Sequence, residues 1–402
     1  MSILPKVRAL VVGVLLVPAL ASAQTSDELF APDVLHDVFL RINTRDLEEL
    51  RASYDLNTYY PADIQIGTEV ARNVAIRSRG RASRNPSKLG LRVDIDHFVA
   101  DQTFFHLNSL VLDNFVQDPS MLREHAAMAL FTRMGQAAPR TAFGRLFIND
   151  EYQGVYGLVE EPNEAFVSRH FGADKGYLFE YHRIGPYYFD DLGEDLATYQ
   201  ALFEPRTQER AAPNLLYAPL RELVRGEDGE SLNDWRARVS AYLDLNELVT
   251  IVAIEEFLSE YDGLTGYAGA NNVYIHRPKG SERHVFIPWD RDQSFFDVYS
   301  PIYLRANENR LVRQALAFPD LNAFYLAQVA EVARISGDGD WLQRVIQRAD
   351  ALIAPSAKAD PRKPFTVDER EGAVRGLVDF AQRRSELVLE QIRQLPPPAV
   401  QP

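Results

Sequence analysis

Apolar and polar residues alternate through the first part of the chain. The segments VFLRI, DIQIG, NVAIRSRG and KLGLRVDID lie between about residue 38 and residue 95 and are separated by turn-forming residues. Alternation with a period of two is typical of strands that bury one face, so these segments predict an antiparallel sheet. Two further alternating segments, RTAFGRLFIND and YQGVYGLVEE, are joined by Asn149, Asp150 and Glu151, which predicts a β-hairpin.

Helical periodicity replaces alternation later in the chain. The segment SMLREHAAMALFTRMG has apolar residues near a helical period and Gly135 at its end, which predicts a helix after the sheet. A second helix is expected over residues 246–260, and residues 305–395 contain several helical runs that stop before a proline cluster. The polar segments RTQERAAPN and RGEDGE predict loops or an insertion within residues 185–235.

These patterns predict an α+β protein. We expect a sheet-rich part over residues 24–165 and a mainly helical part with inserted loops over residues 166–395. Residues 396–402 are rich in proline and predict a disordered tail. With 402 residues, of which 46% are hydrophobic, the chain can bury a substantial core.

Residues 1–23 have the pattern of a signal peptide. Lys6 and Arg8 precede the apolar run ALVVGVLLVPAL, which is followed by three small residues. Because the run is short for a membrane span and contains Pro18, we expect cleavage and export to the periplasm or the extracellular space. No later segment is apolar enough to predict a membrane span.

Charge and composition exclude several classes of function. The formal net charge of −14 and the pI near 5.1 argue against broad binding to nucleic acids or to anionic membranes. The chain has no cysteine, so thiol catalysis, disulfides and cysteine-based zinc sites are excluded. The eight histidines form no HExxH motif, which gives little support to a zinc hydrolase.

A basic segment, RSRGRASRNPSK, lies between two predicted strands at residues 77–88. Gly80, Ser83 and Asn85 permit a tight turn, and the cations around it suit a polyphosphate; these are Arg77, Arg79, Arg81, Arg84 and Lys88. A solvated basic hairpin would have the same composition. The chain contains no GxxxxGK[ST] motif, so this is not a Walker loop.

An acidic pair follows a short apolar strand. The residues FIPW lead directly into Asp290 and Asp292, and a carboxylate at the end of a buried strand needs a cation or a donor nearby. Mg²⁺ binds through one or two carboxylates together with phosphate oxygens, which is one way to compensate these acids. A salt bridge to Arg291 or to a distant arginine is the other.

A third group of polar residues lies in EEFLSEYDGLTGYAGANN. Here a predicted helix ends near Glu260 and a glycine-rich loop follows, with Asp262, Asn271 and Asn272 in it. An acid that orients a hydroxyl, an amide ligand and a metal-binding acid one hairpin later are the components of a phosphoryl-transfer site. Residues of these types also serve as helix caps and turns.

Four blocks of sequence, in order, resemble the CotH family of spore-coat and secreted atypical protein kinases. They are RGRASRNPSKLGLRV, LDNFVQDPSMLREHAAMALF, APRTAFGRLFINDEYQGVYGLVEEPNEAFVSRHFG and NNVYIHRPKGSERHVFIPWDRDQSF. The resemblance extends from about residue 38 to the C-terminal helices. It implies a diverged protein-kinase-like fold with two lobes, which binds ATP with Mg²⁺ or Mn²⁺ and phosphorylates serines of protein acceptors on the surface or in the envelope.

The resemblance also implies roles for residues on the nucleotide side. Lys88 would contact the nucleotide phosphates and take part in catalysis, and the loop with Arg79, Gly80 and Ser83 would cover the phosphates. Glu160 and Glu161 would lie where the two lobes meet and the adenine packs. Glu124, in the predicted helix, is a possible partner for Lys88.

On the acidic side, the resemblance implies that Asp262 is the catalytic-loop acid. Asn272 would be the amide ligand of the metal, and Asp290 would be the metal-binding acid, with Asp292 beside it. Asp262 and Asn272 are separated by 272 − 262 = 10 positions, which is longer than the family's pattern because GYAGA extends the loop.

Two other functions are compatible with these residues. An exported chain reaches a compartment where ATP is scarce, so a surface or envelope scaffold that keeps the fold without turnover is one alternative. A carboxylate-dependent hydrolase that uses Asp290 with Asp292 or Glu160 is the other, because paired acids also serve acid–base chemistry.

Overall fold

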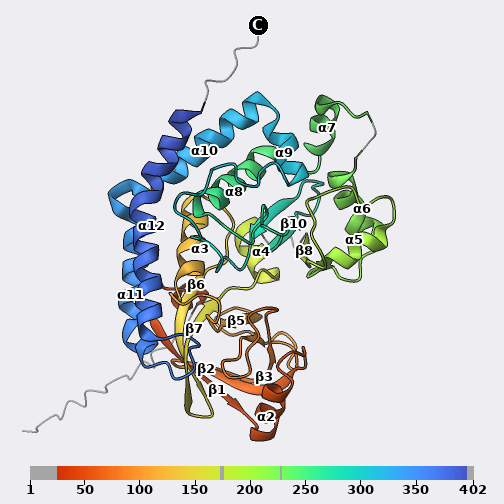
Figure 1. The fold of residues 1–402 in the computed structure, drawn as a ribbon. Coiled ribbons are helices and arrows are strands. Elements are labelled where there is room, and N and C mark those ends of the chain that lie inside the picture. Colours follow the sequence, from red (N-terminus) through yellow and green to blue (C-terminus); the bar gives the residue numbers. More distant parts are fainter. Residues whose placement is uncertain (1–24, 173–175, 227–228, 396–402) are drawn as a thin grey trace, which may run out of the picture.

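The computed structural model describes residues 25–172, 176–226 and 229–395. The predicted signal peptide and the predicted C-terminal tail lie outside these residues. The described chain contains both strands and helices, as the sequence predicts, with strands concentrated before residue 160 (Figure 1). Within the described ranges, no helix combines the length and the hydropathy that crossing a membrane requires.

Seven strands of the first part close into a barrel. Its order is β1-β2-β3-β4-β5-β7-β6, and β6 pairs in parallel with β1 to close the ring. The strands are β1 (Leu35–Ile42), β2 (Tyr60–Ile66), β3 (Glu69–Ser78), β4 (Leu91–Asp94), β5 (Ser109–Asp113), β6 (Thr141–Ile148) and β7 (Glu151–Val159). The other pairs are antiparallel, as expected, but the closure itself was not predicted.

Alternation explains why these segments form the barrel. In β2, for example, every second residue from Tyr60 to Ile66 is buried, and these side chains join a hydrophobic core of the barrel that includes Leu40 and Val74. The predicted hairpin is confirmed as β6 and β7, which are joined through Asn149 and Asp150, both with left-handed backbone angles.

The helices form most of the second part. They are α4 (Glu164–Phe171), α5 (Leu196–Leu202), α6 (Pro213–Val224), α7 (Leu232–Val239), α8 (Leu245–Leu258), α9 (Arg310–Leu316), α10 (Pro319–Gly337), the 3₁₀ turn η1 (Asp338–Asp340), α11 (Trp341–Lys358) and α12 (Val367–Gln394). Helix α8 is buried almost all round, and its N-cap is Asp244, whose carboxylate accepts from the amides of residues 246 and 247. Three helices belong to the first part: α1 (Ser26–Leu29), α2 (Thr44–Ala52) and α3 (Arg123–Arg133).

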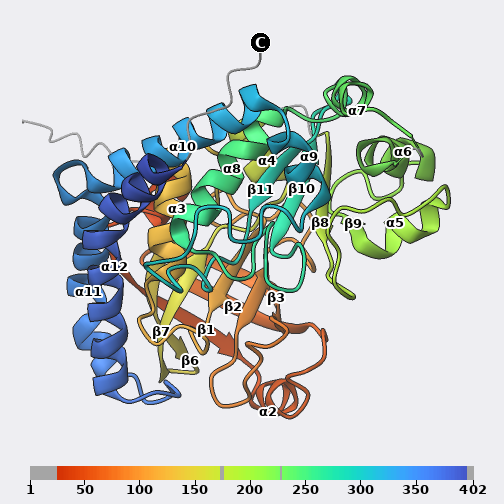
Figure 2. The same cartoon turned by 45° about the horizontal axis from the view of Figure 1, so that its top comes forward.

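A second sheet lies among these helices. Its order is β11-β10-β8-β9, with β8 (Tyr177–Tyr181), β9 (Phe203–Pro205), β10 (Val273–Arg277) and β11 (Val285–Pro288). The hairpin of β10 and β11 carries the two amides before its first strand and the acidic pair after its second. Helices α11 and α12 run beside both the barrel and the helical part, as Figures 1 and 2 show from two directions.

Candidate functional site

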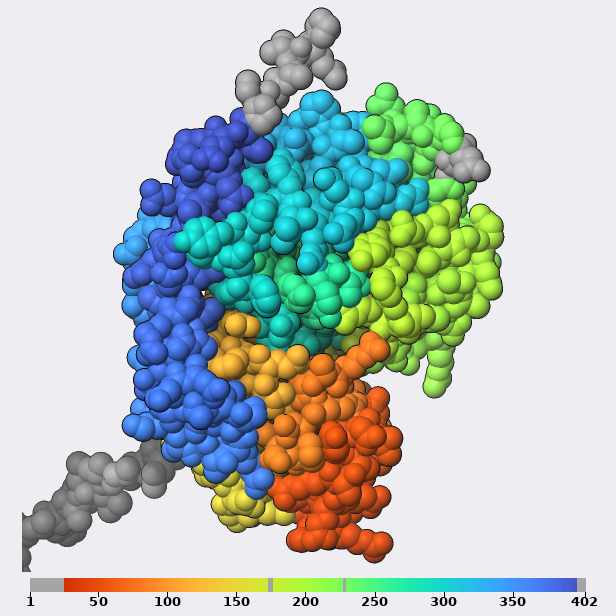
Figure 3. Space-filling model, viewed as in Figure 1, coloured from red at the N-terminus to blue at the C-terminus, as the bar shows by residue number. Residues whose placement is uncertain are grey.

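A large cleft of about 830 Å³ lies between the barrel and the second sheet. The loop after β3 forms one wall, and the segments around Asp262, Asn272 and Asp290 form the opposite wall. In Figure 3 the surface is notched where the orange barrel region meets the yellow-green residues that follow β8. The cleft therefore brings together the basic segment and the acidic segments that the sequence singled out.

Arg79 is the cation of the basic segment that faces the acids. Its guanidinium lies 3.4 Å from Asp113 and 3.8 Å from Asp290, and it stacks over Trp289 at 5.4 Å. Burial opposes the charge of this side chain, but Asp290 and Asp113 outweigh burial and raise the pKa of Arg79. The guanidinium therefore stays charged in the cleft.

The turn that carries Arg79 is tight and held from within. Gly80 has φ of +100°, and a Cβ atom there would lie 2.2 Å from the Ser83 hydroxyl. The Arg84 Nε atom donates to the carbonyl of Gly80 at 2.7 Å, and its Nη1 atom donates to the carbonyl of Leu56. Arg84 thus stabilises the loop rather than offering its full charge to a ligand.

The opposite wall is a hydrogen-bonded group centred on Asp262. Its carboxylate accepts from Asn271 Nδ2 at 2.9 Å and from Asn272 Nδ2 at 3.4 Å, and it pairs with Arg183 at 2.8 Å. Asn272 Nδ2 also donates to the carbonyl of Asp290 at 3.2 Å. Burial raises the pKa of Asp262 even though Asn271 and Arg183 lower it.

Carboxylates crowd together below this wall. Asp292 is partly buried, and burial followed by repulsion from Asp290 and Asp113 raises its pKa well above the ordinary value. The same causes raise the pKa of Glu124 in α3, with burial first and then Asp290 and Asp113. Burial and repulsion between the acids thus disfavour the charged forms of Asp292 and Glu124.

A divalent cation fits this donor set. Asp290 and Asp292 supply carboxylate oxygens and Asn272 supplies an amide oxygen, and oxygen ligands of these kinds are the ones that Mg²⁺ and Mn²⁺ prefer. Both Asp290 and Asn272 have left-handed backbone angles, with φ of +54° and +49°. Such strain in a non-glycine residue gathers at sites where a side chain must be aimed.

Lys88 is not among the described residues that line the cleft, which corrects its expected role. Its Nζ atom lies 2.7 Å from Asp360 Oδ2, and both side chains are fully buried. Burial lowers the pKa of Lys88, and Asp360 opposes this shift. A lysine already neutralised in the interior is not available to nucleotide phosphates, so neither the phosphate contact nor a pair with Glu124 is supported.

The two glutamates expected at the junction of the lobes have different environments. Glu160 is absent from the described lining of the cleft and is held by Arg140 and Arg169. Glu161 does line the cleft, where its two carboxylate oxygens each accept from Arg92 Nε at 2.9 Å. The expectation therefore needs correction for Glu160 and stays a prediction for Glu161.

Sequence reasoning missed a polar group at the rim of the cleft. Glu180, His182 and Glu204 have ligand atoms within 4.8 Å of one another, and Arg206 lies 3.8 Å and 3.7 Å from the two carboxylates. Hydrogen bonds that His182 donates to Glu180 and Glu204 raise its pKa to about 9. Nearby cations thus already compensate the two acids. In the sequence, the signal for this group would have been the polar residues in and next to β8 and β9.

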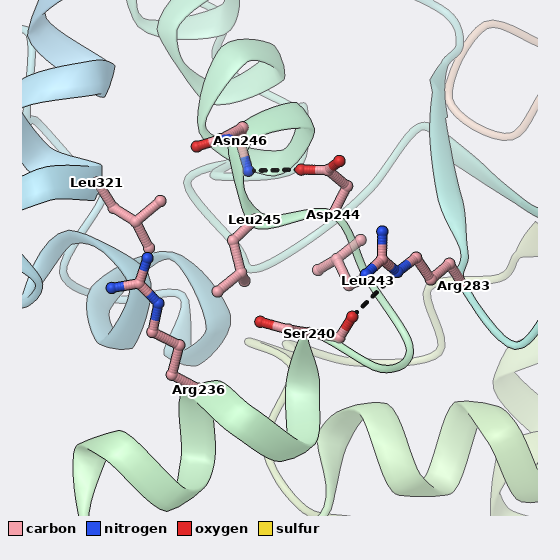
Figure 4. Close-up of a pocket in the computed structure, with 8 residues that line it drawn as sticks. All are labelled: Arg236, Ser240, Leu243, Asp244, Leu245, Asn246, Arg283 and Leu321. Atoms are coloured by element: carbon pink, nitrogen blue, oxygen red, sulfur yellow. Dashed lines mark hydrogen bonds between the residues drawn. The ribbon is translucent and has the colours of Figure 1, made fainter.

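A smaller pocket of about 170 Å³ lies at the start of α8 (Figure 4). Its polar side chains have structural partners: Asp244 accepts from the amide of Asn246 at 2.9 Å, and Arg283 donates to the carbonyl of Ser240 at 3.1 Å. These groups stabilise a helix end and a loop and are engaged in doing so. We therefore take the larger cleft as the candidate site.

Comparison with known proteins assigns the family. The family model described as "CotH kinase protein" matches residues 76–388, which is more than half of the chain. This chain belongs to the CotH kinase family. It is 20% identical over 371 residues to the inner spore coat protein H of Bacillus subtilis (strain 168), covering 88% of this chain and 96% of that protein.

A comparison of structures gives a weak likeness to a solved kinase. The crystal structure of the Helicobacter pylori proinflammatory kinase CtkA has a TM-score of 0.33 and 11% sequence identity, over 80% of this chain and 95% of that one. The membership in the CotH family therefore rests on the sequence, and the matched residues include the cleft walls from Arg79 to Asp292.

Proposed function

We propose that this member of the CotH family is an exported protein kinase that transfers the ATP γ-phosphoryl group to serine hydroxyls of proteins. The barrel would be the N-terminal lobe of a diverged kinase-like fold, over residues 24–165, and residues 166–395 would be the C-terminal lobe. The observation that carries the proposal is the cleft, in which a charged arginine faces a crowded group of acids with oxygen ligands for a divalent cation.

The chain's own residues divide the work of such a reaction. Arg79 would hold phosphate oxygens in place of Lys88, because its partly buried guanidinium lines the cleft and faces Asp290. Asn272, Asp290 and Asp292 would hold Mg²⁺ or Mn²⁺, and bound metal–ATP would supply the phosphoryl group and neutralise its charge. Asp262 would orient the acceptor hydroxyl and accept its proton, and its raised pKa makes it a better base.

The second candidate is a scaffold without turnover. The observation that favours it is the internal pairing of the cleft: Asp262 is already bound by Arg183, and Arg79 already faces two carboxylates. A ligand must break these contacts to use the same groups. Export, which the sequence predicts, also places the chain where ATP is scarce.

Nucleotide-dependent stabilisation and phosphoryl transfer from ATP distinguish the two candidates. The purified chain is titrated with ATP and Mg²⁺ in a thermal-shift assay, where a ligand at 100 times its Kd stabilises by about 2.7 kcal/mol. Labelled ATP then reports transfer to the protein itself or to an added serine-containing protein. The kinase proposal expects both stabilisation and transfer, whereas stabilisation without transfer supports the scaffold.

Three variants test the residue roles. Asp290→Asn should weaken the metal-dependent stabilisation and reduce transfer at least 100-fold, and Asp262→Asn should reduce transfer to the same degree while ATP still binds. The exposed Asp338→Asn, in the turn η1, should behave as the wild type and controls for the loss of a carboxylate. Transfer at the wild-type rate in both cleft variants would refute these assignments.

A further inference from the structure

A fully buried ion pair connects the basic loop to the C-terminal helices. Lys88 Nζ and Asp360 Oδ2 lie 2.7 Å apart with no exposed side-chain surface, although 272 positions separate them in the chain. Lys88 ends the basic loop, residues 79–88, and Asp360 lies in the turn between α11 and α12. The pair therefore joins one wall of the cleft to a distant element.

The pocket for Asp360 is built around its carboxylate. Oδ2 also accepts from the amide of Val155 at 3.0 Å, and Oδ1 accepts from the amides of Arg362 and Lys363 at 2.8 Å and 3.0 Å. Gly154 has φ of +121°, and a Cβ atom there would lie 2.3 Å from the carboxyl group. Four donors and a glycine thus define one position for this side chain.

Hydrogen bonds carry this constraint into the loop. Asn114 Nδ2 donates to the carbonyl of Lys88 at 2.7 Å and to the carbonyl of Ser83 at 3.0 Å, so the end of the loop and its tip share one amide. Arg362 Nη1 donates to the carbonyl of Ser87 at 3.1 Å. The turn after α11 and the basic loop therefore contact each other twice, through the Lys88 side chain on Asp360 and through the Arg362 side chain on the carbonyl of Ser87.

The constraint extends to Arg79 at the start of the loop. The amide of Arg79 donates to the carbonyl of Gly90 at 2.9 Å, and the side chain of Arg79 pairs with Asp113, the residue before Asn114. Both ends of the loop are thus fixed beside Lys88. A shift of Lys88 would move Arg79 relative to Asp290.

Stability alone does not explain a pair of this kind. Removing two charges from water costs several kcal/mol, and well-packed apolar residues of similar volume are often as stable as a buried ion pair or more stable. Directed hydrogen bonds, by contrast, select one arrangement of the segments they join. The ion pair between α11 and α12, Arg370 with Asp350, does not reach the barrel.

We propose that Asp360 and Lys88 are positioning residues, by which the C-terminal helices hold the basic loop in register and Arg79 opposite the acids of the cleft. Only the expected effect on nucleotide binding rests on the proposed function. Asp360 does not itself line the cleft and acts through Lys88 and its loop.

Hydrogen exchange in the full chain without nucleotide tests the positioning. Lys88→Met/Asp360→Leu removes both charges together, and Asp350→Asn, which breaks the Arg370–Asp350 pair between α11 and α12, is the control. In the double variant we expect amide exchange across residues 79–90 to be at least tenfold faster, with α12 and the barrel strands unchanged apart from the amide of Val155, which loses its acceptor. The control should exchange as the wild type does across these residues.

Lys88→Met alone provides a second variant should the double one not fold, because Asp360 keeps three backbone donors in it. Exchange within twofold of the wild type across residues 79–90 would overturn the proposal, and so would equal acceleration throughout the barrel. The latter result would indicate a general loss of stability.

Titration with ATP and Mg²⁺ tests the link to Arg79. The double variant should need at least five times more ATP for half-maximal stabilisation, and unchanged affinity despite faster loop exchange would overturn that link. If the wild type binds no nucleotide, the proposed function fails, whereas the exchange measurement still decides whether the pair holds the loop.

Discussion

Arg79 and Lys88 belong to one basic loop but have opposite environments. The Arg79 guanidinium faces carboxylates of the cleft, whereas the Lys88 ammonium is enclosed with Asp360. Both positions look alike in the sequence because spacing within a loop does not determine which side chain turns inward. The difference matters for the proposed function, since a cation that lines the cleft can meet phosphate and an enclosed one cannot.

Glu256, near the end of α8, predicts a pH dependence of stability. Burial first and then Glu255 raise its pKa from 4.5 to about 8. Between these values the folded chain binds more protons than the unfolded chain, so this group makes stability fall as pH rises, by up to about 1.4 kcal/mol per pH unit.

The variant Glu256→Gln removes this titration. We expect its free energy of unfolding, relative to the wild type, to rise by about 2–4 kcal/mol between pH 5 and pH 8 and then to level off. Urea denaturation at unit steps of pH measures the difference. The exposed Glu308→Gln serves as control, and parallel pH profiles for Glu256→Gln and the wild type would contradict the prediction.

Among the elements, those with a periodic pattern were predictable. The helix expected over residues 246–260 is α8, and the expected hairpin is β6 with β7. The closure of the barrel was not predictable, because β1 and β6 pair across about a hundred residues and parallel pairing leaves no turn between them. The contact of Lys88 with Asp360 was hidden for the same reason.

The candidate site was predictable in part for a related cause. Asp262, Asn272, Asp290 and Asp292 stand beside strands and loops whose order the sequence indicates, and the structure places all four at one cleft. Glu160 and Glu161 point to different sides, and Glu160 forms ion pairs with Arg140 and Arg169. No local pattern distinguishes two adjacent glutamates at the end of a strand.

The docking of the α11–α12 turn on β7 predicts a strong effect at one glycine. In Gly154→Ala the methyl group would occupy the place of the Asp360 carboxyl group, and φ of +121° adds backbone strain. We expect a loss of about 2–4 kcal/mol in the free energy of unfolding. Gly193→Ala is the control, because φ there is +77° but no atom lies within 4 Å.

Gly193→Ala should cost about 1 kcal/mol, which is the strain alone. Chemical denaturation of both variants measures the difference. Equal losses would show that the turn can withdraw from β7 without cost, and the close packing of Asp360 against Gly154 would then carry no weight.

At the scale of the whole molecule, α12 joins the core helix α8 to the segment that follows the acids of the cleft. Arg384 is fully buried and donates to the carbonyls of Glu256 and Phe257 at the end of α8. It also donates to the carbonyls of Val298 and Ser300. The last carbonyls of a helix lack partners within it, so this guanidinium caps α8 from another element.

Replacement of Arg384 by methionine should therefore destabilise the whole fold. Methionine fills a similar volume but leaves four carbonyls without this donor, and breaking such a buried network costs about 3–5 kcal/mol. The neighbouring Arg383→Met removes a half-exposed side chain of the same type and should cost less than about 1 kcal/mol. Thermal and urea denaturation compare the two variants at one pH.

Arg384 also holds residues 298–300, which follow Asp290 and Asp292 in the chain. Its loss should therefore weaken stabilisation by ATP with Mg²⁺ as well. Equal behaviour of both variants would show that α12 packs beside the site without supporting it.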